Sequence, residues 1–343
     1  MQSNHLLYLL YGKKTAYLHE AKFSILSALR HQADRASFSI TVFTDNPEAF
    51  EGWPVATVFL DEPTLADWMG PAGYVHRRKA MAIRRGMELA EKTIFVDTDT
   101  IFLKDPAMLF ERVSDEQFLM DQFEFCWQQA AQREDYTGLV AELTANKRSP
   151  SPALRLYNSG ICGMTRRHTG LLDEAIALID QWAHLHTQLH TMEQIAVSFM
   201  LGDKQVVEAR DCVHHYYSQK SYYHAMVGLF FQRFDEQFSR ALVEVSRGVP
   251  SHLPPPNLTH RVGNKLRLMG LSNELRKVGR YYLLGRKPNT CVYLDATRYV
   301  FWDKALEALR KIPVPEKNEE VNRLWAQDRD FHAFAKRRSG AAS

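Results

Sequence analysis

The chain has 343 residues, of which 45% are hydrophobic and 24% are charged, as is ordinary for a globular protein. This length suits one large domain or two modest ones. The net charge of +3 is too small to indicate nucleic-acid binding by itself, so we expect no nucleic acid as a partner. The four cysteines lie far apart and are expected to be reduced thiols. No apolar run approaches the roughly 18 residues that a membrane span needs, so the sequence predicts a cytoplasmic protein.

The first third of the chain alternates between strand and helix patterns. Short β-branched and aromatic runs bounded by turn residues mark the strands, and apolar residues at steps of three and four mark the helices. Such alternation implies a mostly parallel sheet with helices on both faces. The predicted elements are, in chain order, strand 5–11, helix 15–31, strand 39–43, strand 55–60, helix 76–91 and strand 93–96.

The middle of the chain gives weaker patterns. Segment 133–152 is polar and ends in a proline- and serine-rich run, so we expect a mobile loop there. The other expected elements are strand 154–157, a turn at 158–160, strand 161–164, a helix around 171–182, helix 192–201, strand 205–209 and strand 212–217.

The composition shifts after residue 248, which predicts one domain at 1–248 and a basic, mainly helical region at 249–343. Segment 261–288 carries eight Lys and Arg residues against one acid, a charge of +7. Leucines lie among these charges. The segment is either an amphipathic helix that contacts an anionic membrane or an acidic acceptor, or a solvated face. The first alternative would place the protein peripherally at the inner face of the membrane.

Two aspartates, Asp97 and Asp99, directly follow the strand predicted at 93–96. Open α/β sheets bind ligands outside the carboxyl ends of their strands. Two neighbouring carboxylates repel each other in such a place unless a cation offsets their charge. We therefore expect a divalent cation that in turn holds phosphates, although Asp-x-Asp alone also occurs as solvated loop acids.

Further polar residues could complete such a site. His214 and His215 fall in a predicted strand and therefore face opposite sides of it. One of them could be a third metal ligand, or the ring could pack in an aromatic-rich core. Lys220 could place a positive charge on a phosphate. Asn158 opens the triplet 158–160, whose glycine would let a ligand approach the backbone, and the triplet could equally be an ordinary turn.

Glu193 opens the helix predicted at 192–201, just after Thr191. Its carboxylate is either a favourable first-turn charge or an acceptor for substrate hydroxyls.

Taken in order, these motifs resemble those of the GT-A glycosyltransferases, most closely the family 8 type that includes glycogenin and bacterial lipopolysaccharide galactosyltransferases. Order and rough spacing agree over residues 5–220. The chain departs from the family pattern at Glu193, where Asp is usual, and at Tyr217, where Gly is usual, so the choice between the two histidines stays open. The matching stretches are 7–11, 76–96, 97–99, 158–160, 193–194 and 214–220.

The resemblance implies the α/β GT-A fold, a Rossmann-like mixed central sheet flanked by helices, with a mostly helical C-terminal extension. It implies metal-dependent transfer of a sugar, with retention, from a nucleotide-sugar, most simply a UDP-sugar. The acceptor would be a saccharide, a glycan or a lipid-linked molecule. Asp97, Asp99 and His214 look like the ligands of Mn²⁺ or Mg²⁺.

The resemblance also assigns the donor-binding residues. Tyr11 would lie by the base, Arg78 or Lys79 would help to hold the donor, and Lys220 would bind the diphosphate. Asn158 would face the donor sugar.

Glu193 and Gln194 would also face the sugar, with Gln194 nearest the anomeric carbon. An inverting enzyme would need a carboxylate base, for which Glu193 and Asp121 are candidates.

Three rival functions compete with this interpretation. Phosphatases of the haloacid-dehalogenase type also place Asp-x-Asp after an apolar strand, with one Asp as nucleophile. Gly202-Asp203 followed by Glu208 faintly resembles their later acidic motif. A nucleotidyltransferase could use a similar metal site, and a non-catalytic sugar-binding or scaffold protein could keep the fold.

Overall fold

The computed structural model describes residues 2–34, 36–255, 257–287, 289–312 and 325–340. The chain forms two compact units: Met1–Tyr217 with Glu236–Arg247, and Ser218–Asp235 with Gly248–Ser343. The predicted domain boundary at 248 differs from this division, because segment 218–235 interrupts the first unit in sequence. The assignment of 1–248 as a catalytic domain stays a prediction.

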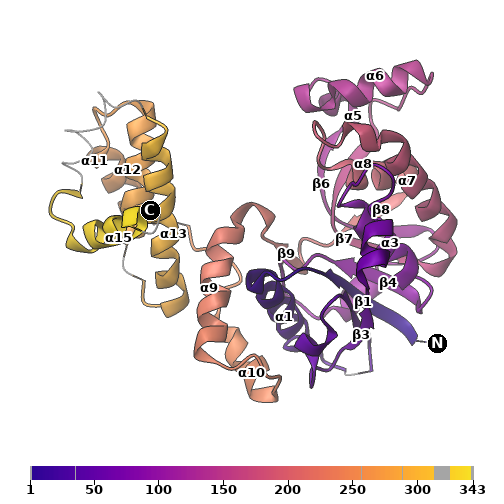
Figure 1. The fold of residues 1–343 in the computed structure, drawn as a ribbon, viewed down its shortest axis with the longest axis horizontal. Helices are drawn as coiled ribbons and strands as arrows, with labels where there is room; N and C mark the ends of the chain where they lie inside the picture. The colour runs from indigo at the N-terminus through magenta and orange to yellow at the C-terminus, as the bar shows by residue number, and fades with distance from the viewer. Residues whose placement is uncertain (1, 35, 256, 288, 313–324, 341–343) are drawn as a thin grey trace. The chain divides into compact units, whose positions relative to one another are not determined.

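A seven-stranded sheet in the order β3-β2-β1-β4-β7-β6-β8 forms the centre of the first unit (Figure 1). β1 is parallel to β2 and β4, and β2 is parallel to β3. β7 runs antiparallel to both β4 and β6, and β8 is parallel to β6. The sheet is therefore mixed, as predicted. The strands are β1 Gln2–Leu10, β2 Ser39–Thr44, β3 Ala56–Phe59, β4 Ala90–Val96, β6 Gln117–Cys126, β7 Arg155–Thr165 and β8 Gln205–Glu208.

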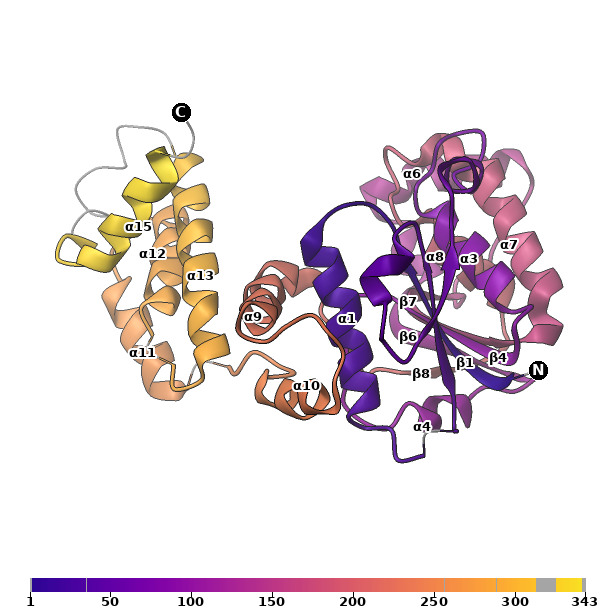
Figure 2. The ribbon, with the colours of Figure 1, turned by 60° about the horizontal axis from the view of Figure 1, so that its bottom comes forward.

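Helices cover both faces of this sheet (Figure 2). α1 (Thr15–Leu29) lies on one face, and α3 (Arg77–Gly86), α7 (Thr169–Trp182) and α8 (Met192–Leu201) lie on the other. β1 is buried on both sides, which is why its sequence is a continuous apolar run rather than an alternating one.

Neighbouring residues of β1 show the two faces. Tyr8 lies on the α1 side, where its hydroxyl is hydrogen-bonded to Ser24 at 3.0 Å. Leu7 joins the core cluster that also contains Ile83 of α3 and Ile179 of α7.

Shorter elements connect the strands and helices of the first unit. Two of them, β5 (Thr100–Phe102) and β9 (Val213–His215), form a separate antiparallel ribbon that pairs Thr100 with His215. The others are η1 Pro47–Phe50, α2 Glu62–Asp67, α4 Ala107–Phe110, α5 Trp127–Ala130, η2 Glu134–Tyr136, α6 Thr137–Ala145, η3 Arg166–His168, η4 Ala183–Leu185, η5 Tyr217–Gln219 (which reaches into the second unit), α10 Arg240–Val245 and η6 Ser246–Gly248 (whose last residue belongs to the second unit).

Several local predictions differ from the structure. Segment 158–160 is not a turn, because β7 runs through it without interruption between β4 and β6. Pairing on both sides outweighs the weak strand propensity of Asn, Ser and Gly. The expected loop at 133–152 contains helix α6. The helix predicted to end at 91 ends at Gly86, and β4 begins at Ala90.

The second unit is helical, as predicted for the C-terminal extension. Its core contains Tyr282, Trp302 and Phe331. Segment 261–288 is not one helix: α11 (Leu258–Arg267) and α12 (Asn273–Gly285) are separated at Gly270, whose φ of 90° is in the left-handed region. Pro288, the last residue of segment 261–288, is outside the described residues. The helices are α9 Lys220–Arg233, α11 Leu258–Arg267, α12 Asn273–Gly285, α13 Val292–Arg310 and α15 Arg329–Gly340.

Across the described ranges of the chain, no helix combines the length and the apolar character that crossing a membrane requires.

Candidate metal centre

The site lies at the edge of the sheet where the parallel strands β1, β2 and β4 have their carboxyl ends. β4 ends at Val96, and the chain then turns through Asp97 and Asp99 into β5. Backbone contacts fix this turn: the Asp97 N–H donates to the Gly160 carbonyl at 2.7 Å, and the Thr100 hydroxyl donates to the Asp97 carbonyl at 2.9 Å. Backbone contacts with β7 and β5 therefore hold the turn that carries the two carboxylates.

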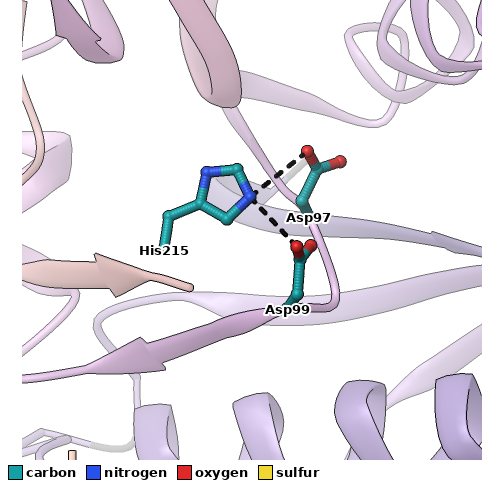
Figure 3. Close-up of side chains that lie close together, drawn as sticks. All are labelled: Asp97, Asp99 and His215. Carbon is teal, nitrogen blue, oxygen red and sulfur yellow. Dashed lines mark ion pairs between the residues drawn. The ribbon is translucent and has the colours of Figure 1, made fainter. Parts of the chain in front are cut away.

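His215 of β9 lies against both aspartates (Figure 3). Its Nε2 is 3.4 Å from Oδ2 of Asp99 and 3.9 Å from Oδ2 of Asp97. One ligand atom from each of the three residues lies within 4.8 Å of the others, so the group could hold a metal ion. The side chains of Asp99 and His215 are each 5% exposed, whereas that of Asp97 is 30% exposed, so the centre opens to solvent on the Asp97 side.

The other ring nitrogen of His215 is bound to Asp121 of β6. Nδ1 lies 2.6 Å from Oδ2 of Asp121, which is buried. A carboxylate in this position holds a proton on Nδ1 and orients the ring so that Nε2 faces Asp97 and Asp99. Burial alone would lower the pKa of His215, but hydrogen bonds to Asp121 and Asp99 and the charge of the aspartates raise the pKa to about 10.

Gly160 makes room for the His215 ring. A Cβ atom at position 160 would overlap the Cε1 and Nδ1 atoms of that ring. The same residue accepts the Asp97 N–H through its carbonyl. Any larger residue in β7 at this point would displace the imidazole, which gives the glycine of the 158–160 triplet a steric role in the centre.

The donor set fits a divalent cation. Carboxylate oxygens suit Mg²⁺ and Mn²⁺, and an imidazole whose outer nitrogen is fixed by a carboxylate is a usual metal-ligand arrangement. Lys79 of α3 supplies a further positive charge, because its ammonium lies 3.0 Å from Oδ2 of Asp97. Burial lowers the pKa of Lys79, but the charges of Asp97 and Glu193 outweigh burial and raise it. The ammonium thus stays charged beside the centre.

A hydrogen-bonded network of amides and carboxylates adjoins the centre. Asn158 and Gln194 each donate an amide N–H to Glu124 of β6, at 3.2 and 2.9 Å. The carbonyl oxygen of the Asn158 side chain accepts from the Gly160 N–H at 2.9 Å, so the orientation of this amide is fixed. Glu124 therefore links β7 to the first turn of α8.

Glu193 is buried at the start of α8. Its Oε2 accepts a hydrogen bond from Ser159 at 2.8 Å, while within the described parts of the chain its Oε1 has no hydrogen-bond partner. Burial raises the pKa of Glu193, and the nearby charge of Lys79 opposes the increase. A buried carboxylate oxygen in this position needs a donor, which an ordered water or a bound ligand can supply.

The ends of β1 and β2 border a cavity of about 380 Å³. Lys13, Lys14 and Asp45 line it, and Asp45 accepts the Gly12 N–H at 2.9 Å. Tyr11 follows directly after β1.

On α3, the Arg78 guanidinium lies 4.6 Å from the centre of the Tyr11 ring, a cation–π geometry. Two of the residues assigned to the donor therefore lie together.

The structure brings together most, but not all, of the residues that the sequence indicated. His214 pairs with Ile101 in the β5–β9 ribbon, one position along from His215, and it is not part of the group that could hold a metal. The structure thus favours His215, the alternative that the sequence left open. Lys220 begins α9 in the second unit, and its assignment to a diphosphate stays a prediction.

The sequence did not predict the roles of two residues of the site. Glu124 was not singled out at all, and Asp121 was considered only as a base. Both lie in β6, where two register shifts against β7 break the simple alternation of faces. Because a bulge changes which side chains share a face, sequence spacing gave no signal for their roles.

The acids that a haloacid-dehalogenase phosphatase would need lie elsewhere. Asp203 follows the end of α8 and is exposed. Glu208 ends the edge strand β8, where it is 3.7 Å from Arg155. Neither belongs to the group of Asp97, Asp99 and His215.

No protein-family model matches the chain, and no curated protein matches it. The structure is similar to that of mouse xyloside xylosyltransferase 1 in its apo form, with a TM-score of 0.41 and 14% sequence identity over 63% of this chain and 91% of that chain. It is also similar to the apo structure of WbbM, a bifunctional glycosyltransferase, with a TM-score of 0.39 and 13% identity over 60% of this chain and 38% of that chain. Similarities this weak decide nothing about function, which has to be inferred from the site.

Proposed function

We propose that the protein is a metal-dependent glycosyltransferase that transfers a sugar from a nucleotide-sugar to a saccharide, glycan or lipid-linked acceptor. The observation that carries the proposal is the convergence of Asp97, Asp99 and the Nε2 of His215 at the carboxyl end of β4. These three residues would hold Mn²⁺ or Mg²⁺. The motif order that resembles family 8 agrees with this assignment, apart from the choice of histidine.

The reaction breaks a bond between a sugar and a diphosphate, so negative charge develops on the departing diphosphate. The cation would stabilise that charge. Lys79 adds a second positive charge close to Asp97. Lys220 is proposed as a third, in line with the resemblance. Because Lys79 is largely shielded from solvent and salt-bridged to Asp97, its charge is already positioned before the donor binds.

The donor base and ribose would bind at the ends of β1 and β2. The cavity of about 380 Å³ lies at the same edge of the sheet as the metal centre, because the three strands are parallel. Tyr11 and Arg78 would contact the base. We propose uridine diphosphate as the carrier, on the resemblance.

Sugar hydroxyls would meet the polar network at β7 and α8. Glu124 holds the amide nitrogens of Asn158 and Gln194, which turns the carbonyl oxygen of Gln194 away from it. Gln194 would then present that oxygen toward the anomeric carbon. The unpartnered Oε1 of Glu193 would accept from a sugar hydroxyl.

The surroundings of Asp121 bear on stereochemistry. Asp121 is buried and bound to His215, so it has a positioning role and does not act as the base that an inverting enzyme needs. Glu193 stays the other candidate base, so we propose transfer with retention on the resemblance alone.

Release of nucleoside diphosphate from a panel of nucleotide-sugars in the presence of Mn²⁺ tests the proposal. We expect slow hydrolysis of one donor, abolished by chelation and by Asp99→Asn. Asp203→Asn is the matched control, since it removes an exposed acid outside the centre, and it should leave the rate unchanged. Hydrolysis of phosphomonoesters that depends on Asp203, with no release from any nucleotide-sugar, would contradict the proposal in favour of a phosphatase.

A further inference from the structure

Helix α11 carries an exposed apolar stripe. Leu258, Val262 and Leu266, together with Met269 in the turn that follows, are spaced by four, four and three residues and so share one helix face. They are 73%, 50%, 62% and 67% exposed, in that order, and no residue of α11 is buried. Single exposed apolar residues are ordinary, but a continuous row of them marks an interaction surface.

Positive charge borders this stripe. Between α11 and α12 lies a groove of about 670 Å³ with Leu268, Met269 and Leu284 among its apolar walls. None of the described residues that line it is acidic. Four cations line the same groove: Arg261 and Lys265 from α11, and Arg276 and Arg280 from α12.

We propose that α11 binds the surface of an anionic phospholipid bilayer. The apolar stripe would enter the boundary between headgroups and acyl chains, and the groove cations would contact lipid phosphates. Both features are needed for this kind of binding. The aliphatic stripe supplies apolar surface that is buried in the bilayer, and the charge of +7 over 261–288 supplies attraction to anionic lipids.

Other partners use only part of this surface. A nucleic acid would engage the cations, but the stripe offers aliphatic side chains and no aromatic ring on which a base could stack. An acidic protein would require a surface of complementary shape, and no feature of α11 selects for such a shape. The inference concerns where the protein works and does not depend on the proposed glycosyl transfer.

Co-sedimentation of the full chain with vesicles tests the inference. We expect binding to phosphatidylcholine vesicles that contain 30% phosphatidylglycerol, weak binding to pure phosphatidylcholine, and a decline as salt is raised. Two variants probe the two features separately. Leu258→Asn with Leu266→Asn removes apolar surface, and Arg261→Glu with Lys265→Glu reverses charge. Each should weaken binding at least about tenfold.

A charge-matched control comes from the exposed pair Lys147 and Arg148, which follow helix α6 in the first unit. Lys147→Glu with Arg148→Glu changes the net charge equally and should leave vesicle binding unchanged. The altered side chains of α11 are largely exposed, so all variants should keep the wild-type melting temperature.

Three results would overturn the inference: no binding to anionic vesicles, equal binding to neutral vesicles, or wild-type binding by the α11 variants. Binding of the full chain to DNA or RNA without binding to vesicles would assign the surface to nucleic acid instead.

Discussion

The imidazole of His215 lies among three carboxylates, and its two nitrogens face different ones. Nε2 faces Asp97 and Asp99, while Nδ1 is bound to Asp121 at 2.6 Å. The ring thus couples a buried residue of β6 to the two acids at the end of β4. A carboxylate that binds one nitrogen of a histidine ligand orients the ring and makes the other nitrogen a more basic ligand for a metal.

Asp121→Asn should therefore weaken Mn²⁺ binding by about 10- to 100-fold, because the neutral amide holds the imidazole less firmly. Isothermal titration measures the affinity. Asp203→Asn serves again as the control and should bind Mn²⁺ like the wild type. Wild-type affinity in Asp121→Asn, with unchanged circular dichroism, would show that Asp121 does not position the ligand.

The sequence predicted two of the three metal-binding candidates for a physical reason. Asp97 and Asp99 follow a strongly apolar strand, and the end of a buried strand is fixed in space by the sheet. The choice between His214 and His215 depends on how β9 pairs with β5, a contact between residues more than a hundred positions apart. Periodicity alone shows that the two rings face opposite sides, but not which side meets the aspartates.

Among the elements, β1 shows how strongly the sheet buries its central strands. His5 lies in this strand and is 1% exposed. Burial lowers the pKa of its imidazole to about 4, and the nearby backbone of Gly86 opposes this only in part. A histidine held neutral inside the sheet makes folding depend on pH.

The direction of that dependence follows from the two pKa values. The pKa of His5 is about 4 in the folded chain and 6.5 in a model peptide, so the unfolded chain takes up the proton first as the pH falls. The stabilising contribution is present above about pH 6.5 and is lost toward pH 4.

Between pH 7 and pH 5, His5 should lower the free energy of unfolding by about 2 kcal/mol. Urea unfolding at both pH values gives the free energy of unfolding of the wild type and of His5→Leu. The contribution of His5 is the difference between the two proteins in how far that free energy changes with pH. His190→Leu, which alters an exposed histidine, is the matched control. An equal change in the free energy of unfolding with pH in the wild type and in His5→Leu would contradict the burial argument.

Element predictions succeeded where the local pattern and the tertiary structure agree. The β1, β2 and β4 runs are apolar because both faces are covered, and the sequence shows this directly. β6 was not predicted, since Asp121, Gln122 and Glu124 interrupt its apolar pattern. These same polar side chains serve the site, so the strand that sequence reasoning missed carries functional residues.

The whole molecule consists of two units, each with a hydrophobic core of its own. Apart from Lys220, the proposed donor site lies in the first unit, and the proposed lipid surface lies in the second. The sequence indicated a change near residue 248 but not that 218–235 belongs with the later helices. α9 packs against α13, about 60 to 90 residues later in the chain, and no local signal encodes that pairing.

Separate cores predict separate unfolding. Differential scanning calorimetry should resolve two transitions, and Mn²⁺ with uridine diphosphate should raise mainly the transition of the first unit, which holds all the proposed donor-binding residues except Lys220. At a ligand concentration of about 100 times Kd, the stabilisation is about 2.7 kcal/mol. Val278→Ala, in the core of the second unit, should lower only the other transition. A single transition whose melting temperature rises with ligand would contradict the separate unfolding of the two units.

Mn²⁺ titration of the paired variants His215→Ala and His214→Ala, each in the presence of uridine diphosphate, tests the account most directly. The two histidines are neighbours in one short strand, so each variant controls for the structural effect of the other. The account predicts that His215→Ala loses affinity for Mn²⁺ at least about tenfold, while His214→Ala keeps it. Full affinity in His215→Ala, or a loss confined to His214→Ala, would contradict it.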